Sequence, residues 1–147
     1  MDGAVHNPPA TADQLAKEVD LLLESMVSSW NAWDSDGFAG HFHPDADFVD
    51  VLGRVWQGRD KIAHIHRLNF ASIHAGSRLQ MIQLASQQLA DGVAVAQLSA
   101  ALWVPAGPLA GDTGATQTWV LTRTGEDWLI KAFQNTWVRN MDGVPEG

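Results

Sequence analysis

Long strand-like segments in the second half of the chain constrain the fold more than any other feature. Short turns separate them, one at Asp91-Gly92 and another at Gly125. Consecutive strands with such short connections predict an antiparallel meander. The Pro- and Gly-rich segment 105–114 is expected to be a surface loop. The expected strands cover residues 78–90, 92–104, 116–124 and 127–138.

The first half of the chain predicts helices instead. The sequence Thr11–Gln14 has the form of a capping box, in which side chains satisfy free N–H groups at a helix start. Apolar residues then recur at steps of three and four, which places them on one helix face. These residues are Leu15, Val19, Leu22, Met26, Trp30 and Trp33. The pattern predicts a long first helix.

Shorter elements are expected between this helix and the meander. A second helix is expected at Phe38–His43, and a strand at Ala46–Leu52. A turn region around Trp56 precedes a third helix, expected from Arg59 to about Ile73. Together the elements predict one α+β domain over residues 11–140, with 1–10 as a flexible lead-in and 141–147 as a C-terminal tail.

Charge and cysteine content exclude several classes of function. The formal net charge of −8 repels nucleic-acid backbones and anionic membranes, so neither is expected as a partner. The absence of cysteine excludes disulfides, thiolate catalysis and cysteine metal sites. No long apolar run and no charged-then-apolar leader occur, and we therefore expect a cytoplasmic protein without a membrane span.

Tryptophan is the unusual component of the sequence, with seven residues beside no tyrosine. Its ring offers a large flat surface and one hydrogen-bond donor, which suits the wall of a hydrophobic pocket. The alternative for each ring is a place in the core or in a dimer interface. The rings expected to bind a substrate are Trp30, Trp33, Trp56, Trp103 and Trp119.

Several short motifs resemble those of one family. They are Trp30 to Asp34, Asp47 to Val49, Gly53 to Arg59, His66 and Phe133 to Thr136. Together they resemble the SgcJ/EcaC family, within the SnoaL-like and ketosteroid isomerase-like (nuclear transport factor 2-like) superfamily. The resemblance covers about residues 12 to 138. It implies a cone: a curved mixed or antiparallel sheet wrapped around three N-terminal helices and an apolar pocket, and a homodimer formed through the sheet.

Asp50 is the first candidate catalytic residue. In the expected strand it shares a face with Phe48 and Leu52, which would point it into the cone. Desolvation there would raise the pKa of its carboxyl toward the range of a general base. The resemblance places it at the position of the catalytic base of ketosteroid isomerases. The alternative is a structural aspartate that caps the turn at Gly53.

His66 is the second candidate, because it shares the buried face of the third helix with Ile62 and Phe70. It would either partner Asp50 across the pocket or be a hydrogen-bonded core histidine. The oxyanion hole of ketosteroid isomerases is not expected, because Met26 occupies the position of their tyrosine. Met26, Gln97 and Gln134 are instead expected to bind the substrate together with the tryptophans. Other donors would be a tryptophan N–H, His66, Gln97 or Gln134.

Alternation along the last strand separates two faces. We expect Gln134 to point inward, because relatives often carry a histidine there and Lys131 on the other face suits solvent. That arrangement leaves Phe133 and Trp137 for the dimer contact.

Two histidine pairs, His41 with His43 and His64 with His66, look like pairs of metal ligands. No metal site is expected, because histidines two residues apart on a helix point in different directions.

These observations lead to one leading hypothesis and one alternative. The leading hypothesis is a cofactor-free acid–base enzyme of isomerase, cyclase or dehydratase type. Its substrate would be a hydrophobic carbonyl, polyketide or polyene-like small molecule of natural-product biosynthesis. The alternative is a non-catalytic module for small-molecule binding or dimerisation, because one fold hosts many functions. Redox chemistry has no support, since the chain lacks a dinucleotide-binding fingerprint.

Overall fold

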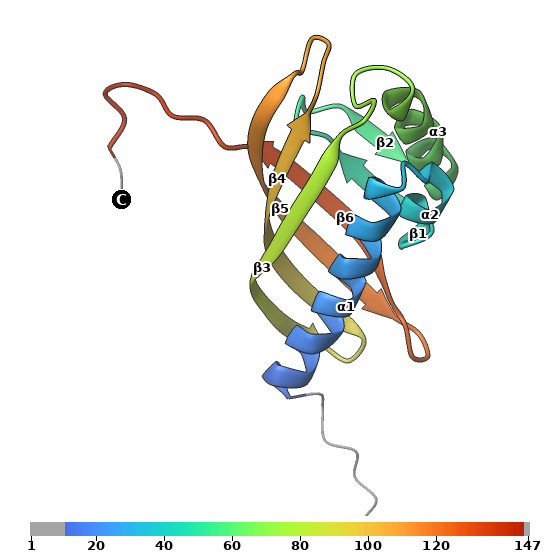
Figure 1. The fold of residues 1–147 in the computed structure, drawn as a ribbon. Coiled ribbons are helices and arrows are strands. Elements are labelled where there is room, and N and C mark those ends of the chain that lie inside the picture. Colours follow the sequence, from blue (N-terminus) through green and yellow to red (C-terminus); the bar gives the residue numbers. More distant parts are fainter. Residues whose placement is uncertain (1–10, 146–147) are drawn as a thin grey trace, which may run out of the picture.

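The computed structural model describes residues 11–145, so the expected lead-in at 1–10 lies outside the described residues. The chain is an α+β fold, as expected, with helices preceding most of a curved sheet (Figure 1). The helices are α1 (Ala12–Asn31), α2 (Ser35–Ala39) and α3 (Arg59–Phe70). The strands are β1 (Phe42–Val49), β2 (Val55–Gln57), β3 (Arg78–Ala90), β4 (Val93–Val104), β5 (Gly111–Arg123) and β6 (Trp128–Trp137).

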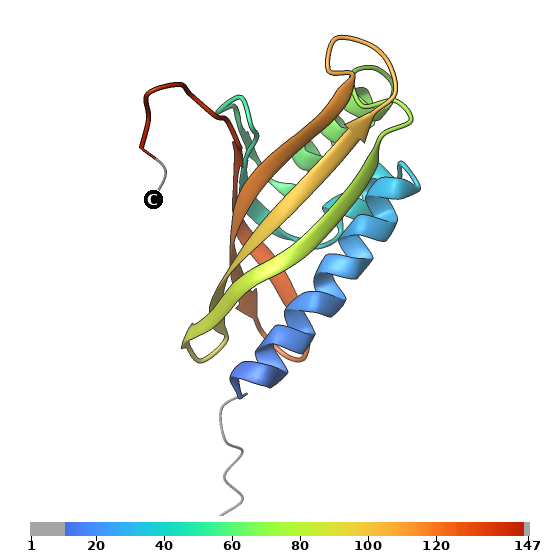
Figure 2. The same ribbon diagram turned by 60° about the vertical axis from the view of Figure 1, so that its left-hand side comes forward.

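The strands form one sheet in the order β2-β1-β6-β5-β4-β3. Strands β3 to β6 are the predicted meander, and β1 joins it by pairing parallel to β6. The sheet curves around the helices, with α1 beside β3 and with α2 and α3 over β1 and β2 (Figures 1 and 2). Among the helices described here, none is long and apolar enough to cross a membrane.

The first helix forms as the sequence predicts. Thr11 Oγ1 accepts a hydrogen bond of 3.1 Å from the Gln14 N–H and caps the helix. Its buried residues are Leu15, Val19, Leu23, Met26 and Trp30. Trp33 was expected on this face, but it lies beyond the helix end with φ of 53° and is 43% exposed.

The expected second helix at Phe38–His43 is wrong. The helix starts earlier, after Asp34, whose carboxylate accepts from the Gly37 N–H, and it ends at Ala39. Phe42 already belongs to β1, and Pro44 lies in the irregular stretch between the residues of β1 that pair with β6. Proline is tolerated there because that stretch does not use every backbone N–H in the ladder.

Two segments expected as turn or loop contain strand. The three residues of β2 were too short to show a pattern, and they pair antiparallel with β1. Strand β5 begins at Gly111, within the expected loop 105–114, because its first residues extend the pairing with β4. The part of the expected tail that is described, 141–145, follows β6 without helix or strand.

A β-bulge in β6 decides which side chains face the interior. Ile130 pairs with Leu121 and Ala132 with Val120, so Lys131 has no partner in β5. An extra residue reverses the alternation of the strand beyond it. Trp128 and Ile130 are buried before the bulge, and Phe133 is buried after it. The expectation of an inward Gln134 is therefore wrong: Gln134 is exposed, and Phe133 and Trp137, expected at a dimer contact, face the interior.

Candidate functional site

A cavity of about 470 Å³ lies between the helices and the inner side of the sheet. A volume of this size falls in the range of about 300–1,000 Å³ that is usual for small-molecule sites. Its wall is mostly apolar and includes Met26, Trp30, Phe48 and Leu102. Polar side chains also line it, namely Asp50, His66, Asn69, His74, Asp112, Thr113, Gln117, Asn135 and Arg139. Such a wall suits a hydrophobic molecule with a small number of polar groups.

Asp50 follows the end of β1 rather than lying within a strand, and its carboxylate is fully engaged. One oxygen, Oδ1, accepts from the backbone N–H groups of Leu52 (2.9 Å) and Arg54 (3.0 Å). The other, Oδ2, accepts from Arg54 Nε (2.8 Å) and Trp56 Nε1 (3.1 Å). The side chain thus organises the turn between β1 and β2 while also lining the cavity.

These contacts reverse the expected ionisation of Asp50. Burial raises the pKa of its carboxyl, but the hydrogen bonds from Trp56 and Arg54 and from the backbone outweigh burial and leave the pKa below its ordinary value. The expectation of a raised pKa is therefore wrong. Asp50 is ionised at neutral pH, in the geometry of the turn-capping alternative.

His66 lies on the buried face of α3, as predicted, and is only 4% exposed. Its Nδ1 donates to the Ile62 carbonyl at 2.7 Å, because a carbonyl can only accept. The ring sits among Phe38, Phe48 and Trp30, with centroid distances of 4.4, 5.1 and 5.8 Å. Burial lowers the pKa of His66 to about 4, so the imidazole is neutral at physiological pH.

Two further polar groups at the cavity lack a partner among the described residues. The Nδ1 atom of His74 and the Oδ1 atom of Asn135 are both buried without a hydrogen bond. Burial also lowers the pKa of His74. A buried polar atom without a partner costs free energy, and a bound molecule can remove that cost.

Gln117 is a third polar group of the cavity wall, and its amide is oriented by a neighbour. Trp119 Nε1 donates to Gln117 Oε1 at 3.0 Å. Gln117 lies opposite Asn135 in the pairing of β5 with β6, so the two amides form one polar band across the inner face of the sheet. Sequence reasoning missed both residues. The bulge in β6 hides the inward position of Asn135. For Gln117 a signal was available, because it lies two residues before Trp119 in β5 and therefore shares its face.

The structure brings together half of the residues predicted for the site. Asp50, His66, Met26, Trp30 and Trp56 line the cavity. The remaining five do not. Gln97 and Trp103 alternate with the buried residues of β4 and are exposed, as Gln134 is on β6. Trp33 donates its indole N–H to the Ser77 carbonyl, and Trp119 is fully buried in the core.

Of the histidine pairs weighed as metal ligands, His41 and His43 do not lie on a helix as expected, because α2 ends at Ala39 and His43 belongs to β1. Both nevertheless have other contacts. His41 Nε2 lies 2.7 Å from Ser25 Oγ, and His43 pairs with Asp45. Within residues 11–145, no three side chains of the metal-binding types lie close enough together to hold an ion.

Solved structures resemble the chain in fold. A domain of unknown function with a cystatin-like fold from Nostoc punctiforme superposes with a TM-score of 0.77, at 24% identity, over 91% of this chain and 82% of that chain. A ketosteroid isomerase-like protein from Erwinia carotovora atroseptica gives 0.72, at 9% identity, over 87% and 99%. An NTF-2 like protein of unknown function from Shewanella oneidensis MR-1 gives 0.69, at 15% identity, over 82% and 97%.

Sequence comparisons add no closer relationship. No protein-family description matches the chain, and no curated protein sequence matches it. The structural likenesses show the fold alone: the chain has the NTF2-like, cystatin-like fold that ketosteroid isomerase-like proteins share with proteins of unknown function.

Proposed function

We propose that this protein binds a hydrophobic small molecule in the cavity and performs cofactor-free acid–base chemistry on it, of isomerase, cyclase or dehydratase type. The supporting observation is a cavity of about 470 Å³ whose mainly apolar wall carries two buried polar atoms without partners. The motifs at Trp30 to Asp34 and Gly53 to Arg59 support a place near the SgcJ/EcaC proteins, and with it a carbonyl, polyketide or polyene-like substrate in natural-product biosynthesis.

His66 is better suited than Asp50 to move a proton in this cavity. The four hydrogen bonds on the Asp50 carboxylate stabilise its charged form, and each weakens when that group takes up a proton. Nε2 of His66 is unprotonated at neutral pH, and no described side chain donates to it. In the proposed reaction His66 takes the proton, Asp50 supplies a fixed negative charge nearby, and the Gln117 amide donates to the oxygen that becomes negative.

The alternative is a binding module without catalysis. The saturated carboxylate of Asp50 favours it, because a turn-forming aspartate needs no chemical role. Both candidates use the same cavity, so the experiment must separate binding from proton transfer.

Hydrogen–deuterium exchange on a simple ketone separates the two. The purified protein is incubated with 1-tetralone in D₂O, and loss of the proton signal beside the carbonyl is followed by NMR. Binding is measured in parallel by quenching of tryptophan fluorescence. The enzyme is supported if exchange is faster with the protein than in buffer alone and if His66→Gln abolishes this acceleration. Bound 1-tetralone without faster exchange supports the module. Both candidates would be contradicted if 1-tetralone does not bind and mass spectrometry detects no molecule that copurifies with the protein.

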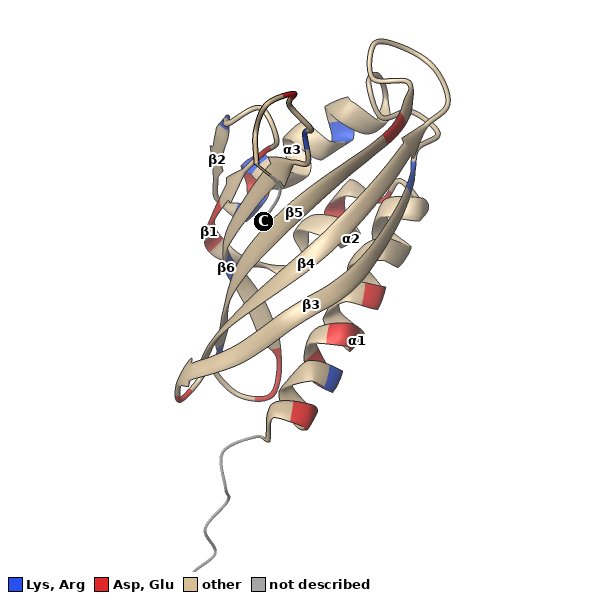
Figure 3. Ribbon diagram, turned by 90° about the vertical axis from the view of Figure 1, so that its left-hand side faces the viewer, with Lys and Arg blue, Asp and Glu red and all other residues tan. Residues whose placement is uncertain are grey.

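We also propose a homodimer through the outer face of the sheet. Figure 3 shows this face almost free of charged residues along β3, β4 and β5. Across it, Val95 pairs with Val120, and Gln97 with Thr118. A face that is almost free of charge can pack against a copy of itself. Light scattering on Val95→Lys tests the dimer: a wild-type dimer and a monomeric variant support it, and a wild-type monomer at all concentrations contradicts it.

A further inference from the structure

The cavity contains two polar groups whose hydrogen-bonding sense is fixed by the protein itself. The first is His66, since its Nδ1 faces the Ile62 carbonyl at 2.7 Å and must therefore carry the proton. Nε2, across the ring, is then an acceptor with a lone pair. The nearest indole N–H, that of Trp30, does not reach it because it donates to Ser77 Oγ at 3.0 Å. His66 therefore presents an acceptor to which no described residue donates, and which a ligand donor can satisfy.

The second group is Gln117. Trp119 Nε1 can only donate, so the amide atom that faces it at 3.0 Å is the oxygen. The NH₂ group of Gln117 is then left as a donor at the cavity wall. Acceptor and donor come from different walls, one from α3 and the other from β5. A ligand that satisfies both needs a donor at one position and an acceptor at another.

The charges around the cavity further limit which ligand group can bind beside His66. Beside His66 the wall carries the carboxylate of Asp50, and the cationic partner of Asp50, Arg54, is already bound to it. Asp112 and Arg139 also line the cavity, and their opposite charges leave no net charge from that pair. An anionic ligand group beside His66 would meet a lone pair and a neighbouring negative charge. A hydroxyl group suits that position, because it donates a hydrogen bond and carries no charge.

Taken with the proposed function, on which this inference rests, we infer that the substrate is a neutral hydroxyketone on a hydrophobic ring or polyene skeleton. Its hydroxyl group donates to His66 Nε2, and its carbonyl oxygen accepts from the Gln117 amide. The hydroxyl proton is then the one that His66 takes. Where the hydroxyl is conjugated with the carbonyl, as in 6-hydroxy-1-tetralone, the electron pair of the broken O–H bond reaches the carbonyl oxygen, whose negative charge the Gln117 amide stabilises.

Three related probes test the inference. 6-Hydroxy-1-tetralone carries both groups, 6-methyl-1-tetralone lacks the hydroxyl, and 5,6,7,8-tetrahydro-2-naphthol lacks the carbonyl. Dissociation constants are measured by tryptophan fluorescence for the wild type, for His66→Phe and for His64→Phe. His64 is exposed on the same helix, so it is the matched control.

The expected result is that His66→Phe discriminates less between the hydroxyl probe and the methyl probe than the wild type does. The preference for the hydroxyl probe over the methyl probe falls by at least about 5-fold in His66→Phe, because the buried hydroxyl loses its acceptor. The preference is unchanged in His64→Phe. Equal discrimination in the wild type and His66→Phe would overturn the inference and leave the proposed cavity intact. Failure of all three probes to bind would instead count against the proposed function.

The carbonyl position has its own variant. Gln117→Glu keeps an oxygen for the Trp119 N–H and removes the NH₂ donor. We expect it to lose the preference for 6-hydroxy-1-tetralone over the tetrahydronaphthol. A retained preference would contradict the role of Gln117.

A measurement on the wild-type protein covers the case in which His66→Phe does not fold. Long-range ¹H–¹⁵N spectra of histidine-labelled protein should show His66 protonated on Nδ1 and bare on Nε2 at pH 7. The Nε2 resonance should move upfield with 6-hydroxy-1-tetralone and stay in place with 6-methyl-1-tetralone. A proton on Nε2, or equal shifts with both probes, would overturn the inference.

Discussion

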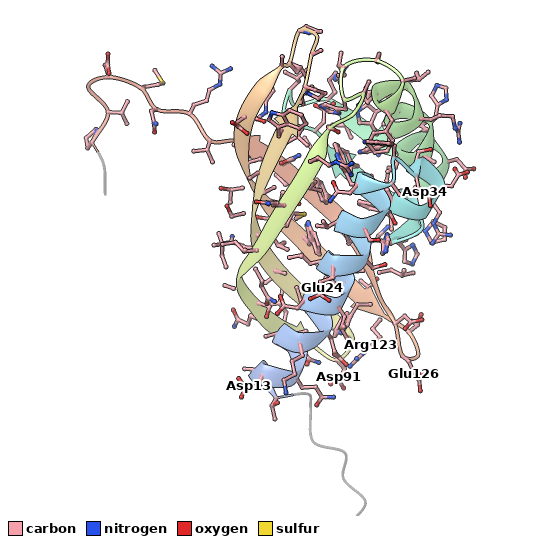
Figure 4. All side chains as sticks on the ribbon, in the orientation of Figure 1. Asp13, Glu24, Asp34, Asp91, Arg123 and Glu126 are labelled. Atoms are coloured by element: carbon pink, nitrogen blue, oxygen red, sulfur yellow. The ribbon has the colours of Figure 1, made fainter. Side chains whose placement is uncertain are left out.

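Two clusters, each made of a carboxylate, an arginine and a tryptophan, lie at opposite ends of the strands. At one end, Glu18 accepts from Trp128 Nε1 at 3.0 Å and from Arg123 at 3.2 Å. The Arg123 guanidinium also lies over the Trp128 ring, 4.4 Å from its centroid. Figure 4 shows Arg123 beside the N-terminal half of α1. This cluster, Glu18 with Arg123 and Trp128, joins the first helix to the last two strands.

The other cluster, Asp50 with Arg54 and Trp56, is local. The same donors bind the carboxylate, and Arg54 lies 5.5 Å from the centroid of the Trp56 ring. Asp50 and Arg54 belong to the β1–β2 turn and Trp56 to β2, and Asp50 and Trp56 line the cavity. The comparison teaches that sequence separation decides the role: the distant cluster stabilises the fold, and the local one shapes one wall of a site.

The bulge at Lys131 allows Trp128 at one end of β6 and Phe133 nearer the other end to face the interior together. Its loss should have the largest effect on stability. Deletion of Lys131 would restore strict alternation and turn either Trp128 or Phe133 outward. We expect more than about 4 kcal/mol of lost stability, or no folding, because a whole set of core side chains changes face. Lys131→Ala keeps the register and should cost under about 1 kcal/mol. Urea unfolding compares the two, and a deletion variant as stable as Lys131→Ala would contradict the role of the bulge.

Acidification should weaken the molecule at the cavity end through His66. The folded state holds the pKa of His66 at about 4, below the ordinary 6.5, so the unfolded chain binds a proton that the folded protein does not. Stability therefore falls as the pH falls from 6.5 toward 4, by roughly 3 kcal/mol at the low end. His74 acts in the same direction.

The measurement is the free energy of unfolding in urea between pH 7 and 4.5. The loss should shrink markedly in His66→Phe and persist in His64→Phe, whose histidine is exposed. An unchanged slope in His66→Phe would place the pH dependence elsewhere.

The distant cluster should matter more for stability than the local one. Glu18→Gln turns one acceptor oxygen into a donor that faces Arg123 and Trp128, and we expect a cost of about 2 kcal/mol. Glu24→Gln is the control, because Glu24 is exposed on the same helix. If Glu18→Gln and Glu24→Gln lower the free energy of unfolding equally, the cluster does not stabilise the packing of α1 on the sheet.

Asp50→Asn should have the smallest effect on global stability, about 1 kcal/mol, because it alters one turn. Its signature is at low pH. The pKa of Asp50 is lowered in the folded protein, so its contribution is present above the ordinary carboxyl pKa of 3.8 and is lost as the pH falls below it.

The wild type should therefore lose more stability than Asp50→Asn between pH 4 and pH 2. An Asp50→Asn variant that costs more than Glu18→Gln at pH 7 would reverse the proposed ranking of the two clusters.

The fold was largely predictable because its long elements carry their own signals. The capping box at Thr11 and the apolar spacing after it predict α1, and turn residues such as Gly92 predict the meander. The inner face of β6 was not predictable. A bulge is a property of a pair of strands, and the sequence of β6 alone does not reveal that Lys131 has no partner.

The candidate site was predictable only in part, for a similar reason. His66 follows from helical spacing, because α3 is regular. The pKa of Asp50 depends on the hydrogen bonds that Arg54 and Trp56 donate to it after the turn. The alternation of side chains along a strand does not reveal these contacts. Gln97 and Trp103 were assigned to the cavity by residue type, and their place in β4 puts them on the outer face.

The parallel pairing of β1 with β6 has a consequence for how the chain folds. Strand β1 is synthesised early, and the short β2 is the one neighbour in the sheet that follows it closely in the sequence. Its longer partner, β6, is synthesised only after β3, β4 and β5. Such distant pairing slows folding and leaves an uncovered strand edge during synthesis. The cavity wall that contains Phe133 and Asn135 thus closes only after every residue from β1 to β6 has left the ribosome.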